Sequence, residues 1–177
     1  MSRDISTIHA VVFRLRDEEF AIEVQDVREV LPLAEVIPLP QSPDSIEGII
    51  DLRGHIVAVM DLRKQFGLQE TEKTDKSRIM IVRSNRMIVG LIVDGVREVI
   101  KISRDLIHPT PAMITSQIHH RYISGVVRWN GRIIVLLNLE ALLTPAEAEY
   151  LRSIRTPPSR KESQTPEEKR PESGTPL

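Results

Sequence analysis

Short apolar runs separated by small polar breaks recur along most of the chain, a pattern typical of β-strands joined by tight turns. Four of these breaks are short enough to be hairpin turns, and they lie at residues 17–19, 53–55, 84–86 and 130–131. The last one, Asn130 followed by Gly131, is the strongest signal, because both residue types tolerate positive φ. The pattern therefore predicts a mainly β protein.

Helical signals are few and short. Asp61 can cap a helical turn that runs through Phe66 and stops at Gly67. Thr144 precedes Pro145 and stands three residues before Glu147, which is the pattern of an N-terminal capping box with proline at the first helical position. We therefore expect a C-terminal helix over residues 145–153.

The sequence contains an internal repeat. Residues 21–30 match residues 90–99 at an offset of 69, with five of ten positions identical, and both segments end in Val-Arg-Glu-Val. Residues 46–62 match residues 123–139 at an offset of 77, with glycine and apolar positions retained. The repeat predicts two similar units, roughly 11–75 and 76–143. Each has the size of a closed five-stranded barrel, and we expect the two to pack along a shared apolar seam.

The composition changes beyond the predicted helix. Residues 156–177 are rich in Pro, Ser, Thr, Glu and Lys, and contain no bulky apolar residue before Leu177. Such a segment cannot bury enough apolar surface to offset the entropy lost on ordering. We expect a disordered tail, and favour an inert tail over a docking segment.

Composition narrows the function. The 177 residues contain 24 basic and 25 acidic side chains, and this near balance argues against a protein whose main partner is nucleic acid. The absence of cysteine excludes disulfides, thiolate metal sites and a cysteine nucleophile. We see neither a signal peptide nor an apolar run long enough to span a bilayer, so we expect a cytoplasmic protein with no direct membrane insertion.

The sequence offers little catalytic chemistry. It has no glycine-rich phosphate loop and no nucleophile elbow, and its five histidines lack the spacing of metal ligands. Asp61 aligns with Asn138 in the repeat, and these two residue types are interchangeable as helix caps but not as acids. We therefore expect a protein that is not an enzyme and that holds no cofactor and no metal.

Two charged positions have alternative interpretations. Arg53 stands at a predicted hairpin tip, where it either pairs with a nearby acid such as Asp51 or Glu47 or acts as a binding anchor. The residues alone do not favour one of these two interpretations over the other. Glu29 and Glu98 occupy the repeated Val-Arg-Glu-Val. A solvated ion-paired face is more common for such residues than a partner contact.

The motifs, in their order and spacing over residues 8–151, resemble the CheW family of bacterial chemosensory adaptors. This resemblance implies two SH3-like five-stranded β-barrel subdomains with short helices. Asp51 departs from the asparagine that commonly precedes Leu-Arg-Gly in the family. The resemblance rests on residues 11–15, 19–22, 27–30, 46–56, 61–63 and 89–96 and on the hairpin at Gly125.

The resemblance also implies a function and its residues. Family members are non-enzymatic scaffolds that couple methyl-accepting chemoreceptors to a CheA-type histidine kinase at receptor arrays on the inner face of the membrane. By position, Val27 and Glu29 would contact the CheW-like regulatory domain of the kinase. Four residues would contact the cytoplasmic tip of the receptor or the array, namely Gly48, Arg53, Ile79 and Val99.

The resemblance leaves the pathway open. A CheW-like adaptor could serve pilus-driven motility or another output rather than flagellar chemotaxis. Outside this family, the alternative is a small ligand- or RNA-binding β-barrel protein, which predicts a basic face with exposed aromatic residues. We expect a monomer in isolation.

Overall fold

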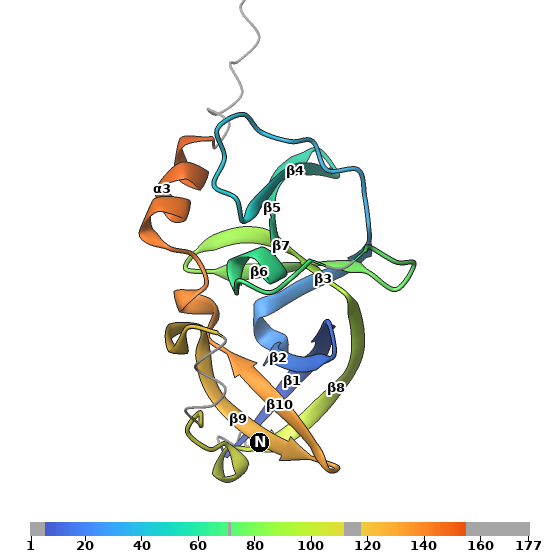
Figure 1. Ribbon diagram of the computed structural model, residues 1–177, viewed down its shortest axis with the longest axis vertical. Helices are drawn as coiled ribbons and strands as arrows, with labels where there is room; N and C mark the ends of the chain where they lie inside the picture. Colours follow the sequence, from blue (N-terminus) through green and yellow to red (C-terminus); the bar gives the residue numbers. More distant parts are fainter. Residues whose placement is uncertain (1–5, 71, 112–117, 155–177) are drawn as a thin grey trace, which may run out of the picture.

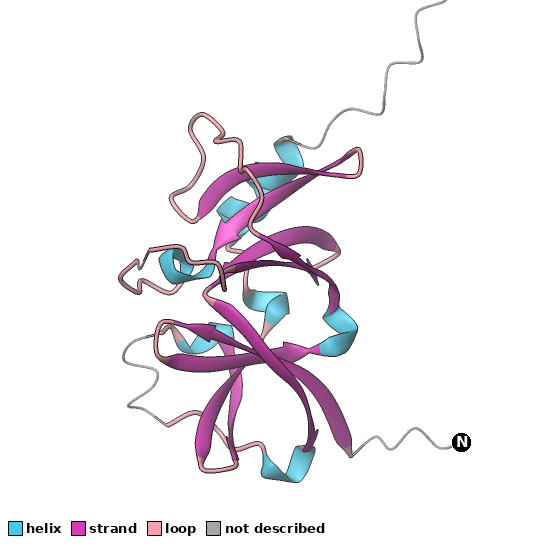
Figure 2. Cartoon of the chain, turned by 90° about the vertical axis from the view of Figure 1, so that its right-hand side faces the viewer, coloured by secondary structure: helices cyan, strands magenta, loops and turns pink. Residues whose placement is uncertain are grey.

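The computed structural model describes residues 6–70, 72–111 and 118–154. Residues 156–177, where the sequence predicts a disordered tail, lie outside the described part. The described chain folds into two five-stranded sheets, which Figures 1 and 2 show stacked along the long axis of the molecule. The predicted mainly β architecture of two five-stranded units with few and short helices is confirmed.

Sheet A has the strand order β8-β1-β2-β10-β9 and sheet B the order β3-β6-β7-β5-β4. In sheet A, the strands are β1 (Thr7–Leu15), β2 (Glu18–Glu23), β8 (Gly95–Ser103), β9 (Ile123–Trp129) and β10 (Arg132–Leu137). In sheet B, they are β3 (Val27–Pro32), β4 (Ile46–Leu52), β5 (His55–Asp61), β6 (Arg78–Ser84) and β7 (Met87–Val93). Each sheet therefore combines strands from both sequence repeats.

This exchange of strands corrects one prediction. Residues 11–75 and 76–143 do not form one barrel each, because β1 and β2 leave the first repeat to pair with β8 and β10 of the second. The chain changes sheets at η1 (Val24–Asp26) and again at Asp94, between β7 and β8. The hydrophobic pattern identifies strands but not the distant strands with which they pair. A sequence repeat therefore does not show that each repeat folds into its own barrel.

The sheets curl without closing into complete barrels. In sheet B, Ile37 follows edge strand β3 and exchanges two backbone hydrogen bonds of 2.8 and 2.9 Å with Ile49 on the other edge strand, β4. In sheet A, His108 follows β8 and makes the equivalent bridge to Val126 on β9, again at 2.8 and 2.9 Å. One short bridge thus narrows the gap in each sheet.

The described residues form three apolar cores, one of which joins the two sheets. The largest lies between the sheets and includes Phe13, Phe20, Phe66 and Tyr122, so the predicted shared seam is present. The other two lie within the curl of sheet A and of sheet B, respectively. Their burial supplies the main stabilisation, at roughly 25 cal/mol per Å² of apolar surface.

The remaining elements are short helices: α1 (Leu62–Gln65), α3 (Pro145–Ser153) and the 3-10 turns η1, η2 (Arg104–Leu106), η3 (His120–Tyr122) and η4 (Leu139–Ala141). The predicted capping box of α3 forms: the Thr144 hydroxyl accepts from the Glu147 amide, and the Glu147 carboxylate accepts from the Thr144 amide. Asp61 caps α1 as predicted, accepting from the Arg63 amide at 2.9 Å. Among the described residues, no helix has the length and apolar character required to cross a bilayer.

Candidate functional site: an arginine at the tip of the β4–β5 hairpin

The β4–β5 turn holds Arg53 in an unusual backbone conformation. Arg53 has φ 51° and Gly54 has φ 84°, so both central residues of this two-residue turn lie in the left-handed region. Glycine and asparagine adopt this conformation readily, whereas a long side chain does so at a cost. At the equivalent turn of sheet A, Asn130 has φ 48° and Gly131 has φ 75°. Asparagine would therefore adopt the conformation of Arg53 at lower cost.

Arg53 pairs with Glu29 and not with either of the acids close to it in sequence. Its two terminal nitrogens donate to the two carboxylate oxygens of Glu29 at 3.0 and 2.6 Å, forming a bidentate pair. Asp51 instead accepts from the Gly54 amide at 2.8 Å and stabilises the turn. Glu47 pairs with Lys64 at 2.5 Å. The structure shows the ion pair that was one of the two interpretations of Arg53, with Glu29 as the partner.

The pair joins the two edges of sheet B while leaving the arginine open to solvent. Glu29 lies on edge strand β3, and Arg53 lies at the end of edge strand β4. The Arg53 side chain is 71% exposed and that of Glu29 is 28% exposed. The hydrogen bond from Arg53 lowers the pKa of the Glu29 carboxyl below its ordinary value, so both groups are charged at neutral pH. We call Glu29 and Arg53, with the hairpin tip that carries them, the edge-pair surface.

Gly48 on β4 allows the backbone near Ile37 to pack closely against this strand. A Cβ atom on Gly48 would lie 2.0 Å from the Ile37 carbonyl oxygen, and φ at Gly48 is +152°. The absence of a side chain lets the segment around Ile37 close against β4. Gly48 is thus required by the close approach of two backbones, which is a structural reason for a residue that the resemblance placed in the receptor contact region.

The other predicted contact residues are scattered. Val27 is half-buried and packs against the core between the sheets. Ile79 is fully buried within sheet B and exposes no surface there, so its contact with the receptor or array stays a prediction. Val99 is 60% exposed, but it lies on β8 at the edge of sheet A. The structure brings Glu29 and Arg53 together and leaves Val99 on the other sheet.

Exposed apolar side chains next to these positions were missed by sequence reasoning. Val30 follows Glu29 on β3, and Ile56 stands three residues after Arg53 on β5; both are exposed. Their repeat equivalents, Val99 and Ile133, are exposed as well. The repeat alignment contained this information, because the same two positions are apolar in both repeats and are exposed in both sheets.

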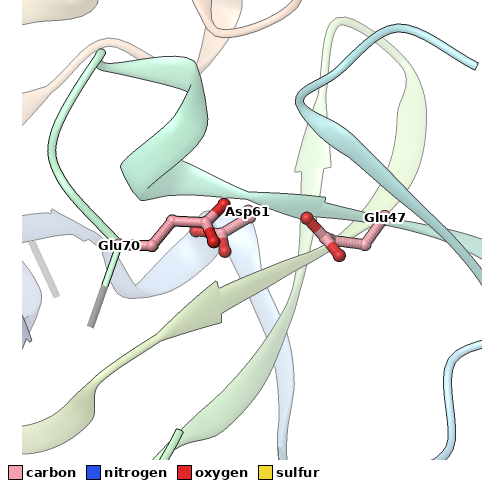
Figure 3. A group of neighbouring side chains, drawn as sticks. All are labelled: Glu47, Asp61 and Glu70. Atoms are coloured by element: carbon pink, nitrogen blue, oxygen red, sulfur yellow. The ribbon is translucent and has the colours of Figure 1, made fainter. Parts of the chain in front are cut away.

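Three carboxylates approach one another near α1 (Figure 3). Glu47, Asp61 and Glu70 each offer an oxygen within 4.8 Å of the others. Protein cations already neutralise them: Arg63 donates to both oxygens of Asp61, and Lys64 reaches Glu47 at 2.5 Å and Glu70 at 3.2 Å. The hydrogen bond to Glu47 raises the pKa of Lys64, which keeps this ammonium charged. The group is an ion-pair cluster in which Asp61 serves as the helix cap.

A small cavity opens beside sheet A. Its volume is about 200 Å³, and most of its lining is apolar, including Ile8, Ala21 and Leu136, with Glu23, Arg104 and Ser124 as polar groups. Pockets that enclose small-molecule ligands usually measure about 300–1,000 Å³. Its size therefore gives little support to the ligand-binding alternative, and none of the predicted contact residues lines it.

The comparisons with known proteins agree on one family. The profile described as CheW-like domain matches residues 9–147. A "Probable chemotaxis protein CheW" of Rhizobium etli is 32% identical over 139 residues, covering 78% of this chain and 89% of the relative. "Chemotaxis protein CheW" of Rhizobium meliloti is 31% identical with the same coverage. The crystal structure of the scaffolding protein TtCheW from Thermoanaerobacter tengcongensis matches with a TM-score of 0.73 and 36% identity, covering 79% of this chain and 94% of that one.

Proposed function

Because the chain belongs to the CheW-like domain family, we propose that it is a non-enzymatic adaptor of bacterial chemotaxis. In this role it couples methyl-accepting chemoreceptors to a CheA-type histidine kinase in a signalling array at the inner face of the membrane. The relatives carry the name of a chemotaxis protein, and the solved structure is titled a scaffolding protein. Coupling by an adaptor requires surfaces rather than a reaction centre.

The observation that carries the proposal is Arg53 itself. Asparagine would satisfy this turn at lower conformational cost, as it does at Asn130 in the other sheet. The arginine is nevertheless present, held in one place by a rigid two-residue turn and by Glu29. A preorganised and largely exposed arginine is a frequent anchor in protein interfaces, because little entropy is lost when it is desolvated by a partner.

We assign the edge-pair surface to partner binding as a single surface. The resemblance gives Glu29 to the kinase contact and Arg53 to the receptor or array contact, yet the two side chains are 2.6 Å apart. A partner that contacts one of them must therefore displace or accommodate the other. Binding at one contact then changes the electrostatics of the neighbouring one, which gives an adaptor a direct means of coupling two partners.

Reconstitution tests the proposal. The protein is mixed with a CheA-type kinase and with receptor cytoplasmic fragments, and co-sedimentation and kinase autophosphorylation are measured. We expect the protein to enter the pellet with both partners and to change the autophosphorylation rate in the presence of receptor fragments. Failure to bind either partner would contradict the adaptor function.

A further inference from the structure

The two sequence repeats are interlocked halves of one fold. We define the N-half as β1 through α1 and its C-cap Phe66, residues 7–66, and the C-half as β6 to α3, residues 78–153. Replacing each strand of sheet A by its equivalent in the other repeat converts the order β8-β1-β2-β10-β9 into β3-β6-β7-β5-β4, which is sheet B. Each half thus gives a hairpin to one sheet and three strands to the other.

The strand registers obey the same relation. The pair Ala10↔Ile100 in sheet A corresponds to Ile79↔Leu31 in sheet B after the offset of 69. The parallel pair Leu136↔Ala21 likewise corresponds to Val59↔Gly90. The bulges coincide as well, because Arg28 and Arg97 are the unpaired extra residues in β3 and β8. The two halves therefore dock by two copies of one pairing scheme.

Neither half contains a complete sheet. Four strand pairings join the halves, namely β1·β8, β2·β10, β3·β6 and β5·β7. Without them the N-half retains two separate hairpins and the single strand β3, and the C-half retains the equivalent pieces. An isolated two-stranded hairpin is marginally stable at best in water. The main core also draws residues from both halves, for example Phe20 and Phe66 against Tyr122.

Buried polar contacts add specificity to this docking. Arg63 of the N-half, which is almost completely buried, donates to Asp94 of the C-half at 3.2 Å. Asp94 also accepts from the Arg16 amide at 2.6 Å. At the other side, Glu147 in α3 accepts from the Ser45 hydroxyl at 2.6 Å and from the Gln65 amide group at 3.0 Å.

The link between the halves has a different character. Of the described residues between Gln65 and Arg78, those at 67, 69, 70 and 72–76 are exposed. They contribute no strand to either sheet. The polar contacts of this linker are local, such as the ion pair of Glu70 with Lys64 and the hydrogen bond from the Thr74 amide to Ser77, while Leu68 packs against the main core. The linker therefore acts as a tether, and the contacts by which the two halves recognise each other lie in the strand pairings and the main core.

We propose that the two halves recognise each other as separate partners, so that a second copy of this chain can supply either half. In such an exchanged dimer, every strand pairing and every polar contact between halves is retained, and the linker alone changes its path. A short flexible tether sets an effective concentration on the order of 1 mM, so the monomer predominates at micromolar concentration and exchange appears as the concentration approaches that value.

A cut in the linker tests the recognition between halves. A protease recognition sequence is inserted between Glu72 and Lys73 of the full chain, and the folded protein is cleaved. We expect both fragments to co-elute at the size of the uncleaved protein with an unchanged circular dichroism spectrum, and to separate only in denaturant. Fragments that part in native buffer, or that unfold cooperatively on their own, would overturn the proposal.

Engineered cysteines test the exchange, since the chain has none of its own. His9 and Lys101 are exposed, lie opposite each other, and belong to different halves. The variant His9→Cys/Lys101→Cys is refolded at about 1 µM and at about 1 mM and then oxidised. We expect a disulfide within one chain at the low concentration and a disulfide-linked dimer at the high one.

A matched pair within one half controls for ordinary aggregation. Arg128 and Ile133 are also exposed and opposite each other, but both belong to the C-half. The variant Arg128→Cys/Ile133→Cys should stay a single chain on a non-reducing gel at both concentrations. Linked dimers from both variants, or from neither at 1 mM, would refute exchange.

Discussion

The two sheets carry equivalent glutamates, Glu98 in sheet A and Glu29 in sheet B, but the charged groups around them differ. In sheet A, Glu98 belongs to a ring of four charges: Arg132 contacts Glu98 at 2.5 Å and Glu19 at 3.0 Å, and Arg97 contacts both carboxylates. In sheet B, the equivalent Glu29 pairs with Arg53. Ile88 stands at the position of Glu19, and His55 at the position of Arg132.

The difference separates a residue that completes the fold from one that is available to a partner. The Arg132 side chain is 26% exposed and bridges three strands, whereas that of Arg53 is 71% exposed and extends from a turn. Sheet A also has the favourable asparagine at its turn, whereas sheet B has Arg53 there. We propose that the charges at the end of sheet A serve stability, and that Arg53 at the end of sheet B serves recognition.

The largest effect should come from the glycines that let each sheet narrow its gap. Gly48→Ala places a Cβ 2.0 Å from the Ile37 carbonyl oxygen at a positive φ, and should cost about 3 kcal/mol of unfolding free energy. Gly125→Ala meets the Ile107 Cγ2 methyl at 2.5 Å and the His108 carbonyl oxygen at 3.1 Å but needs no positive φ, and should cost less, about 2 kcal/mol. Urea unfolding of both variants measures the difference. Equal losses of unfolding free energy in the two variants would show that the bridges at Ile37 and His108 depend on their glycines to the same extent.

The next effect concerns binding. Arg53→Ala should weaken association with the kinase and receptor fragments by about tenfold or more, as expected for an interface anchor, while the midpoint of unfolding stays near that of the parent. Arg132→Ala is the matched control: it should lower the midpoint of unfolding, because two carboxylates lose a partner, and leave binding intact. Titration calorimetry and thermal unfolding report the two quantities. The reverse assignment, with Arg132 needed for binding and Arg53 for stability, would invert our interpretation.

Glu29→Ala should produce a smaller loss of binding than Arg53→Ala. The substitution releases Arg53 from its bidentate partner, so the arginine keeps its charge but loses the preorganisation that the pair provides. Surface plasmon resonance with immobilised kinase should show a slower association rate. Glu98→Ala offers the equivalent change in sheet A and should leave this rate unaltered.

The smallest effect is on titration. Because the folded pKa of Glu29 lies below its unfolded value, the pair stabilises the fold above the ordinary glutamate pKa, and this contribution is lost as pH falls through the folded value. Arg53→Ala should raise the pKa of Glu29, since the hydrogen bond from Arg53 is the largest cause of its lowering. Carboxyl NMR titration measures the change. An unaltered pKa would mean that the pair is absent in solution.

Local features were predictable from the sequence, and non-local pairings were not. The capping box at Thr144 and the turn at Asn130 depend on neighbours within three residues, so their residue types reveal them. The partner of Arg53 is 24 residues away in sequence, and hydrophobic pattern does not indicate which strand edges meet. For the same reason, the repeat revealed two equivalent units but not that they exchange strands.

Burial weighs against one of the predicted contact residues. Ile79 stands in an apolar run of β6 in which both faces are covered, one by the sheet B core and the other by the core between the sheets. A continuous apolar run predicts burial on two faces and therefore argues against a contact role. Val99 belongs to an alternating strand in which exposed and buried residues follow each other, and such strands can present an apolar side chain to a partner.

Arg53→Asn tests the central claim most directly, because it gives sheet B the turn residue of sheet A and removes only the anchor. The measurement is co-sedimentation with receptor fragments and kinase, with the unfolding midpoint determined on the same preparation. We predict a midpoint equal to or above that of the parent, since asparagine suits positive φ, together with at least a tenfold loss of co-sedimentation. A variant that co-sediments like the parent would show that Arg53 is not a binding anchor and that partner binding lies elsewhere.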